Sequence, residues 1–213
     1  MLIERALDFF GINAVFTRHP PLPLAGLPPD VLVSPCQGLL DKLAPIDGEG
    51  RFEEKPVLGR PRRLALSDLR LPAEFRDLFL HGLYLKIYLA PWDRHGVVCP
   101  HAARVLRQDR VQGSALPLVF MPSADLENRK HGLLMQTSRG DYYYLMMIGS
   151  FMVNSLAVLA RTGQNLATGQ RLGEFRLGSS VVLLFPPRSV EPLVAEGAKL
   201  GLGRPLLRWR CEP

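Results

Sequence analysis

Short apolar segments with turn residues between them dominate the chain. Residues 84–90 read YLKIYLA and alternate in polarity, which predicts a strand with one buried face. Residues 131–150 read HGLLMQTSRGDYYYLMMIGS and predict a hairpin of two apolar strands joined at SRGD. Residues 181–185, VVLLF, form a continuous apolar run and predict a fully buried strand.

Weaker patterns lie around these three segments. VLVS and GLL flank a PCQ turn at 35–37, RLALSDLRL alternates over 63–71, and the chain after Val190 predicts a strand, a glycine turn and a strand. A helix is expected from Pro72 to a stop at Gly82.

The N-terminal part differs in composition from the rest. Residues 1–12 predict a short helix ended by Gly11, and the Pro-rich segment 18–30 predicts an extended linker. We therefore expect residues 1–30 to precede one domain over 31–213. That domain is predicted to be mainly β with a few helices (α+β), and not an alternating βαβ chain.

Charge and cysteine content narrow the class of protein. The formal net charge is +6, and a basic surface attracts the phosphates of nucleic acid or of an anionic membrane. No Lys/Arg run is interleaved with aromatic residues, which disfavours nucleic acid. The basic cluster RPRR at 60–63 agrees with contact to anionic lipid. Three cysteines without a CxxC pair, and no signal peptide, predict reduced thiols and a cytoplasmic protein, peripheral at the membrane at most.

The sequence RLGSSVVLLF contains the strongest candidate for chemistry. Gly178 permits backbone angles that other residues avoid, so the hydroxyl of Ser179 can approach the preceding carbonyl carbon. An N-to-O acyl shift there, followed by elimination, would leave a pyruvoyl group. The same letters also describe an ordinary turn before a strand.

The surroundings of this serine favour the chemical interpretation. The chain resembles the phosphatidylserine decarboxylase family, in order from about Val31 to Leu207. Five segments carry the resemblance: VLVSPCQGLL, IYLAPWDRHGVVCP, the stretch from LENRKHGLL to FMVNSL, TGQRLGEFRLGSSVVLLF, and VEPLVAEGAKLGLGRPL. The SPCQG turn and the last hairpin also resemble a barrel-sandwich β core, although no lysine stands at a carrier position.

The resemblance implies a self-cleaving proenzyme. It would be cut between Gly178 and Ser179, and the piece 179–213 would begin with a pyruvoyl group that acts as electron sink for loss of carbon dioxide. His95 would donate the proton that decarboxylation requires. Asp93, Arg129 and Ser180 become candidates for substrate binding. The implied substrate is phosphatidylserine or another amino-acid head group, and we expect a homodimer.

Two positions depart from the family pattern. An aspartate and a histidine assist self-cleavage in the family, and Gln37 and Val98 stand at these positions. A neutral amide cannot stabilise an imidazolium as a carboxylate does, and valine cannot act as a base. The sequence therefore leaves two alternatives open: a working decarboxylase, or an uncleaved family member that binds an anionic lipid or a protein partner without catalysis.

Cysteine and histidine offer further candidates. Cys36 and Cys99 lie beside the two altered positions. They could act as replacement nucleophiles, or, in the simpler interpretation, they are small buried side chains. His95 and His101 lack a carboxylate-rich cluster that would complete a metal site, so we assign no metal.

Overall fold

The computed structural model describes residues 21–57, 60–114, 116, 124–150, 156–175 and 179–210 of the 213-residue chain. The helix predicted over 1–12 lies outside these residues, and so does Gly178. Residues 21–30 contain neither helix nor strand, and turns lie at 25–26 and 29–30.

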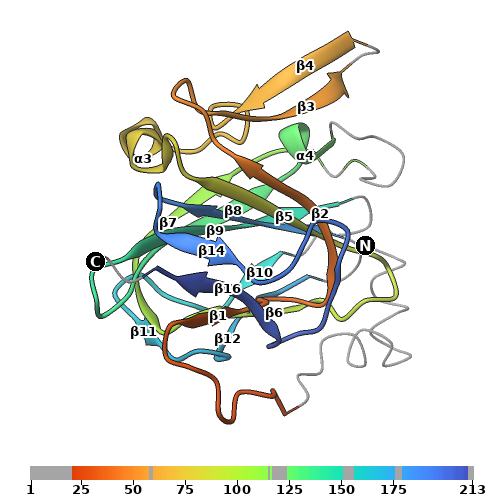
Figure 1. Ribbon diagram of the computed structural model, residues 1–213. Coiled ribbons are helices and arrows are strands. Elements are labelled where there is room, and N and C mark those ends of the chain that lie inside the picture. The colour runs from red at the N-terminus through yellow and green to blue at the C-terminus, as the bar shows by residue number, and fades with distance from the viewer. Residues whose placement is uncertain are drawn as a thin grey trace.

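An antiparallel sheet of eight strands forms the centre of the molecule (Figure 1). Its strand order is β11-β7-β8-β9-β13-β5-β2-β15. The strands are β2 (Gly38–Pro45), β5 (Leu83–Leu89), β7 (Ala103–Val111), β8 (Lys130–Gln136), β9 (Tyr142–Gly149), β11 (Asn165–Leu166), β13 (Ser179–Phe185) and β15 (Lys199–Leu200).

Smaller elements cover both faces of this sheet. One three-stranded sheet joins β1 (Val31–Val33), β16 (Pro205–Trp209) and β14 (Val190–Pro192), and another joins β10 (Ala157–Val158), β12 (Arg171–Glu174) and β6 (Gly96–Val98). The remaining elements are the hairpin β3 (Arg51–Val57) and β4 (Arg60–Ala65), the helices α3 (Ala73–Arg76) and α4 (Ala124–Glu127), and the 3-10 turn η1 (Asp77–Phe79).

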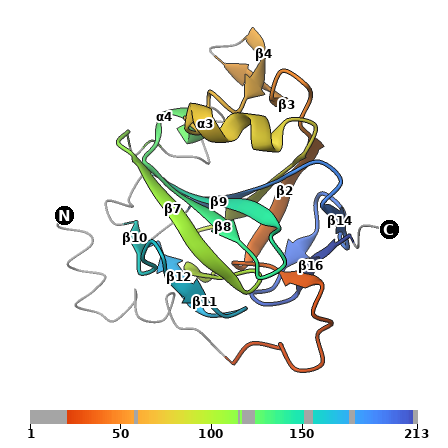
Figure 2. The ribbon, with the colours of Figure 1, turned by 90° about the vertical axis from the view of Figure 1, so that its left-hand side faces the viewer.

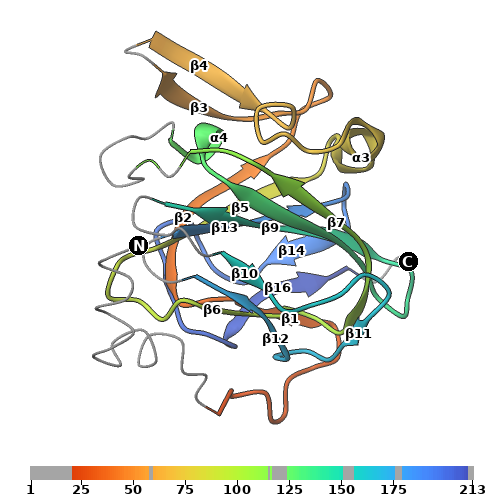
Figure 3. The same cartoon turned by 180° about the vertical axis from the view of Figure 1, so that it is seen from behind.

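The large sheet separates two apolar cores. Figures 2 and 3 show α3, α4 and the β3–β4 hairpin on one side of it and the two small sheets on the other. Strand β13 contributes to both cores because its side chains alternate: Val181, Leu183 and Phe185 face the small sheets, and Val182 and Leu184 face the helices. Both faces are buried, which explains why VVLLF reads as a continuous apolar run.

The strongest sequence patterns are confirmed. The segments YLKIYLA, HGLLMQ, YYYLMMIG and VVLLF lie in β5, β8, β9 and β13, and the chain is mainly β. Strand β13 begins two residues before the apolar run, so Ser179 and Ser180 are inside the strand and not in a turn.

Two weaker predictions need correction. The alternating segment 63–71 leaves its strand at Ala65 and turns, because the Asp68 carboxylate accepts a hydrogen bond from the Ala65 N–H at 2.9 Å and closes the chain on itself. The helix expected up to Gly82 ends early: four residues of α3 pass into η1, and His81 takes a left-handed backbone with φ of 58°.

Candidate functional site

Ser179 lies at the end of the central strand of the large sheet. It pairs with Leu89 of β5 on one side and with Gly149 of β9 on the other, and it is fully buried. The N–H of Gly149 donates to the carbonyl oxygen of Arg129 at 3.0 Å, which extends the row by one strand. Arg129, an exposed residue, is therefore two strand spacings from Ser179, roughly 10 Å along the sheet.

The two serine hydroxyls are buried polar groups. Among the described residues, the Oγ atoms of Ser179 and Ser180 have no hydrogen-bond partner. Because side chains alternate along a strand, Ser179 faces the core between the large sheet and the two small sheets. Ser180 faces the core on the side of α3 and α4. Leaving such a group without a partner costs roughly 1–3 kcal/mol, so an orphaned hydroxyl calls for an explanation.

His95 is linked by backbone contacts to the segment that leads into Ser179. It precedes β6, which pairs with β12, and its carbonyl oxygen accepts a hydrogen bond from the Phe175 N–H at 2.9 Å. Burial lowers the pKa of the imidazole to about 4, although the negative charge of Asp93 and a hydrogen bond to the Asp93 backbone act in the opposite direction. At neutral pH the ring is therefore uncharged and can accept a proton.

Gln37 contacts the loop that carries His95. Its Nε2 donates to Asp93 Oδ1 at 3.3 Å, and Asp93 Oδ2 accepts from the Ala90 N–H at 2.8 Å. Val98 is buried, and its N–H donates to the carbonyl oxygen of Pro35 at 2.8 Å. The two altered positions, which are far apart in the sequence, are thus brought close together by the contact of β6 with the turn that precedes β2.

The two thiols fit the simpler interpretation. Cys36 is fully buried, and burial together with the charge of Asp93 raises its pKa well above the ordinary value. Burial raises the pKa of Cys99 to about 11, and its Sγ donates to the His101 carbonyl oxygen at 3.0 Å. Both groups remain protonated at neutral pH, and a protonated thiol is a poor nucleophile.

Asn128 is a positioning residue that sequence reasoning missed. Its buried side chain donates to the carbonyl oxygens of Gly149 at 2.8 Å and Leu116 at 2.9 Å, and it accepts from the Leu116 N–H at 2.7 Å. The amide therefore fixes the end of β9 beside Ser179. The only signal in the sequence was its place next to Arg129 in the segment that resembles the family.

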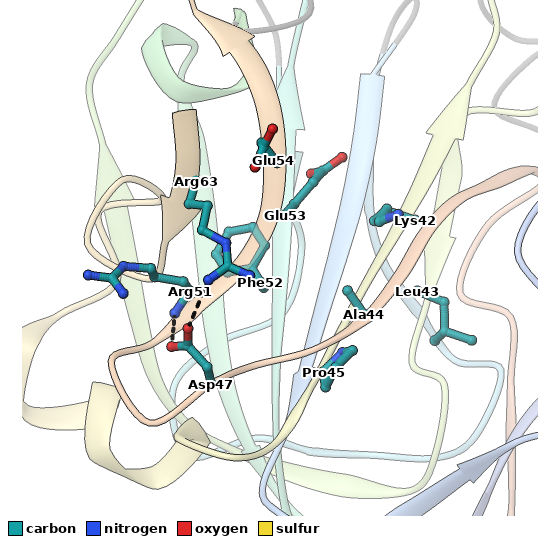
Figure 4. Close-up of a pocket in the computed structure, with 10 residues that line it drawn as sticks. All are labelled: Lys42, Leu43, Ala44, Pro45, Asp47, Arg51, Phe52, Glu53, Glu54 and Arg63. Atoms are coloured by element: carbon teal, nitrogen blue, oxygen red, sulfur yellow. Dashed lines mark hydrogen bonds and ion pairs between the residues drawn. The ribbon is translucent and has the colours of Figure 1, made fainter. Parts of the chain in front are cut away.

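Two cavities lie away from these residues. One, of about 450 Å³, lies between β2 and the β3–β4 hairpin (Figure 4). Asp47, one of its three acids, accepts a hydrogen bond from the Arg51 N–H at 2.8 Å and lies 3.9 Å from the guanidinium of Arg63. The other, of about 390 Å³, is lined by residues of β7, β11 and the β8–β9 turn. Neither is lined by Ser179, His95 or Gln37. Within the described residues no cluster of three or more His, Cys, Asp or Glu could hold a metal ion.

Comparison with known proteins gives one consistent result. A family model described as phosphatidylserine decarboxylase matches residues 12–208. The phosphatidylserine decarboxylase proenzyme of Halorhodospira halophila is 32% identical in an alignment of length 225 that covers 92% of this chain and 74% of the relative. The proenzyme of the same name from Acidovorax ebreus is 31% identical over 207 residues, which cover 86% of this chain and 71% of the relative.

Proposed function

Because the chain belongs to the phosphatidylserine decarboxylase family, we propose that it is a decarboxylase that forms a pyruvoyl group from Ser179 and acts on phosphatidylserine. The observation that carries the proposal is the Ser179 hydroxyl, which is buried at the end of the central strand without a hydrogen-bond partner in the described part of the chain. A hydroxyl that is not committed to another group is available to attack the neighbouring carbonyl.

Formation of the pyruvoyl group would take two stages. Ser179 Oγ attacks the Gly178 carbonyl carbon, the C–N bond breaks, and the hydroxyl proton passes to the released amine, which gives an ester. Loss of the Ser179 Cα proton then breaks the Cβ–Oγ bond and frees the Gly178 carboxylate. Water converts the remaining unsaturated amine to the ketone and releases ammonia.

The residues around Ser179 suit this chemistry. His95 is uncharged at neutral pH and can take up the protons that the steps release. Ser179 is fully buried at the end of a sheet that separates two cores, which limits the access of bulk water to its hydroxyl. When present, the pyruvoyl group supplies the electron sink for loss of carbon dioxide.

Substrate would be held beside the row of strands that contains Ser179. Arg129 is an exposed residue at this end of the sheet, and an arginine guanidinium is suited to bind a carboxylate or a phosphate. Ser180 and Asp93 remain proposed substrate-binding residues, and a homodimer remains a proposal as well.

Peripheral contact with an anionic membrane is part of the proposal. No helix in the described ranges is long and apolar enough to cross a membrane. Trp92, in the loop between Asp93 and β5, is 77% exposed, and tryptophan prefers the boundary between lipid and water. A lipid substrate would then be reached from the membrane surface.

A non-catalytic role is the alternative, and specific residues favour it. Gln37 offers an amide where a carboxylate assists cleavage in the family, Val98 offers no base, and the pKa of His95 near 4 makes it a weak base. In this alternative the chain stays whole and binds an anionic lipid or a protein partner.

The mass of the purified full-length protein separates the two functions. We expect two fragments divided at 178/179, the smaller beginning with a pyruvoyl group and therefore resistant to Edman degradation. The variant Ser179→Ala lacks the attacking hydroxyl and should remain a single species. If the unaltered chain also stays a single species of 23.7 kDa over days, the decarboxylase proposal is wrong.

A further inference from the structure

The carboxylate of Asp93 lies where two segments of the candidate site meet. Its Oδ1 accepts a hydrogen bond from Gln37 Nε2 at 3.3 Å, and its Oδ2 accepts from the Ala90 N–H at 2.8 Å. The Asp93 N–H in turn donates to the Ala90 carbonyl oxygen at 2.9 Å, which closes the turn after β5. The carboxylate thus lies against the side chain at position 37, where the family has its own carboxylate.

The charge of this carboxylate acts on neutral neighbours. Among the described residues, no cation forms an ion pair with Asp93. Its negative charge raises the pKa of the Cys36 thiol, of the Tyr88 hydroxyl and of the His95 imidazole. For the imidazole, burial has the larger effect and lowers the pKa to about 4, and the Asp93 charge offsets part of that effect, in the same sense as a carboxylate beside a catalytic histidine.

Backbone contacts connect Asp93 to Ser179 in both directions. Ala90 directly follows Leu89, the strand partner of Ser179. In the other direction, His95 follows Asp93 by two residues, and the His95 carbonyl oxygen accepts a hydrogen bond from the N–H of Phe175, four residues before Ser179. Movement of Asp93 would therefore shift His95 relative to Ser179.

We propose that Asp93 is a positioning residue that supplies, from the loop after β5, the carboxylate absent from position 37, and that it holds His95 for proton transfer at Ser179. This inference rests on the proposed self-cleavage. It explains how the chain can retain that chemistry with glutamine at position 37. It also gives Asp93 a role that differs from substrate binding.

A purely structural role has to be separated from this one. The Asp93 carboxylate also caps the turn that starts at Ala90, and Asp68 caps the turn that starts at Ala65 in the same way. Asp68 Oδ2 accepts from the Ala65 N–H at 2.9 Å, and the Asp68 N–H donates to the Ala65 carbonyl oxygen at 2.9 Å. Asp68→Asn is therefore a control for the loss of charge in such a turn, and it also removes the ion pair of Asp68 with Arg62. Asparagine keeps an oxygen that can accept the cap bond, so both substitutions preserve the turn.

Self-cleavage is compared in the full-length parent, Asp93→Asn, Asp68→Asn and the double variant Gln37→Asp/Asp93→Asn. We expect Asp93→Asn to slow cleavage by roughly 10–100-fold, a fraction of what general acid–base assistance contributes. Asp68→Asn should cleave at the parent rate. The double variant, which moves the carboxylate to position 37, should recover cleavage. Parent-like cleavage by Asp93→Asn, or a double variant as slow as Asp93→Asn, would overturn the proposal.

A second measurement does not depend on cleavage. In the same proteins carrying Ser179→Ala, the His95 ring is titrated by NMR. The His95 pKa should fall in Asp93→Asn and return to the parent value in the double variant. His131 serves as internal control, because it is also buried with a pKa of about 4, but the charge that acts on it is that of Arg110. An unmoved His95 pKa contradicts the role of Asp93 even if cleavage occurs. A parent chain that never cleaves contradicts the proposed function, and the His95 titration then still decides about Asp93.

Discussion

At the residue scale, His95 is a titratable group that the fold holds away from water. The side chain is fully buried, and burial lowers its pKa from 6.5 to about 4. The unfolded chain therefore binds a proton at a higher pH than the folded chain does. Between these two values, stability must fall as the pH falls, because protonation favours the unfolded state.

The free energy of unfolding should accordingly decrease as the pH is lowered from about 6.5 to about 4. The pKa difference corresponds to about 3 kcal/mol for His95, and His131 adds to it in the same direction. Urea unfolding of His95→Gln across this pH range should show a flatter dependence than the parent. His81→Asn, at an exposed position with left-handed backbone, should keep the parent's dependence. An equal slope in His95→Gln and the parent would show that His95 does not titrate in this way.

At the element scale, the candidate site depends on the close approach of β2 to β5. Gly38 begins β2, and a Cβ atom there would collide with the carbonyl oxygen of Tyr88, which is backbone and cannot move aside. This explains the glycine that ends the SPCQG segment. It also fixes Gln37, the preceding residue, at its distance from Asp93.

Gly38→Ala should therefore separate the ends of β2 and β5. We expect a loss of roughly 1–3 kcal/mol in the free energy of unfolding, as for other overpacked positions, together with slower self-cleavage. Gly201→Ala is the control, because its Cβ would approach only the flexible Arg204 side chain at 3.1 Å. Its stability should change by no more than about 0.5 kcal/mol. Equal losses in the two variants would mean that the β2–β5 approach is not tight.

At the scale of the whole molecule, the large sheet divides the protein into two buried cores, and the candidate site lies at one end of its central strand. Trp92 lies in the same loop as Asp93 and is largely exposed, whereas Trp209 is buried with only 1% exposed. These are the two tryptophans of the chain, so a change in fluorescence on membrane contact would report Trp92.

Vesicles that contain phosphatidylserine should shift the tryptophan emission of the protein to shorter wavelength. Trp92→Ala should lose this shift and bind the vesicles about threefold to tenfold more weakly, which corresponds to the removal of about 1 kcal/mol of interfacial contact. Leu193→Ala, at another partly exposed apolar position, should bind as the parent does. Unchanged vesicle binding by Trp92→Ala would exclude this loop from membrane contact.

The sequence by itself determined the class of fold and the candidate serine. Segments such as YYYLMMIG and VVLLF are recognisable because burial of one or both faces imposes a local pattern on neighbouring residues. The order of short motifs around Ser179 indicated the family that the comparisons show. Where local patterns were short, as in 63–71, a single side-chain cap from Asp68 outweighed them.

Only the tertiary structure decided how the candidate residues meet. That Ser179 lies between Leu89 and Gly149 depends on the register of three strands, and no local pattern encodes a register between distant segments. The contact of Gln37 with Asp93 likewise joins residues that are 56 positions apart. Sequence could show that position 37 lacks a carboxylate, but the folding of β2 against β5 decides which carboxylate lies beside it.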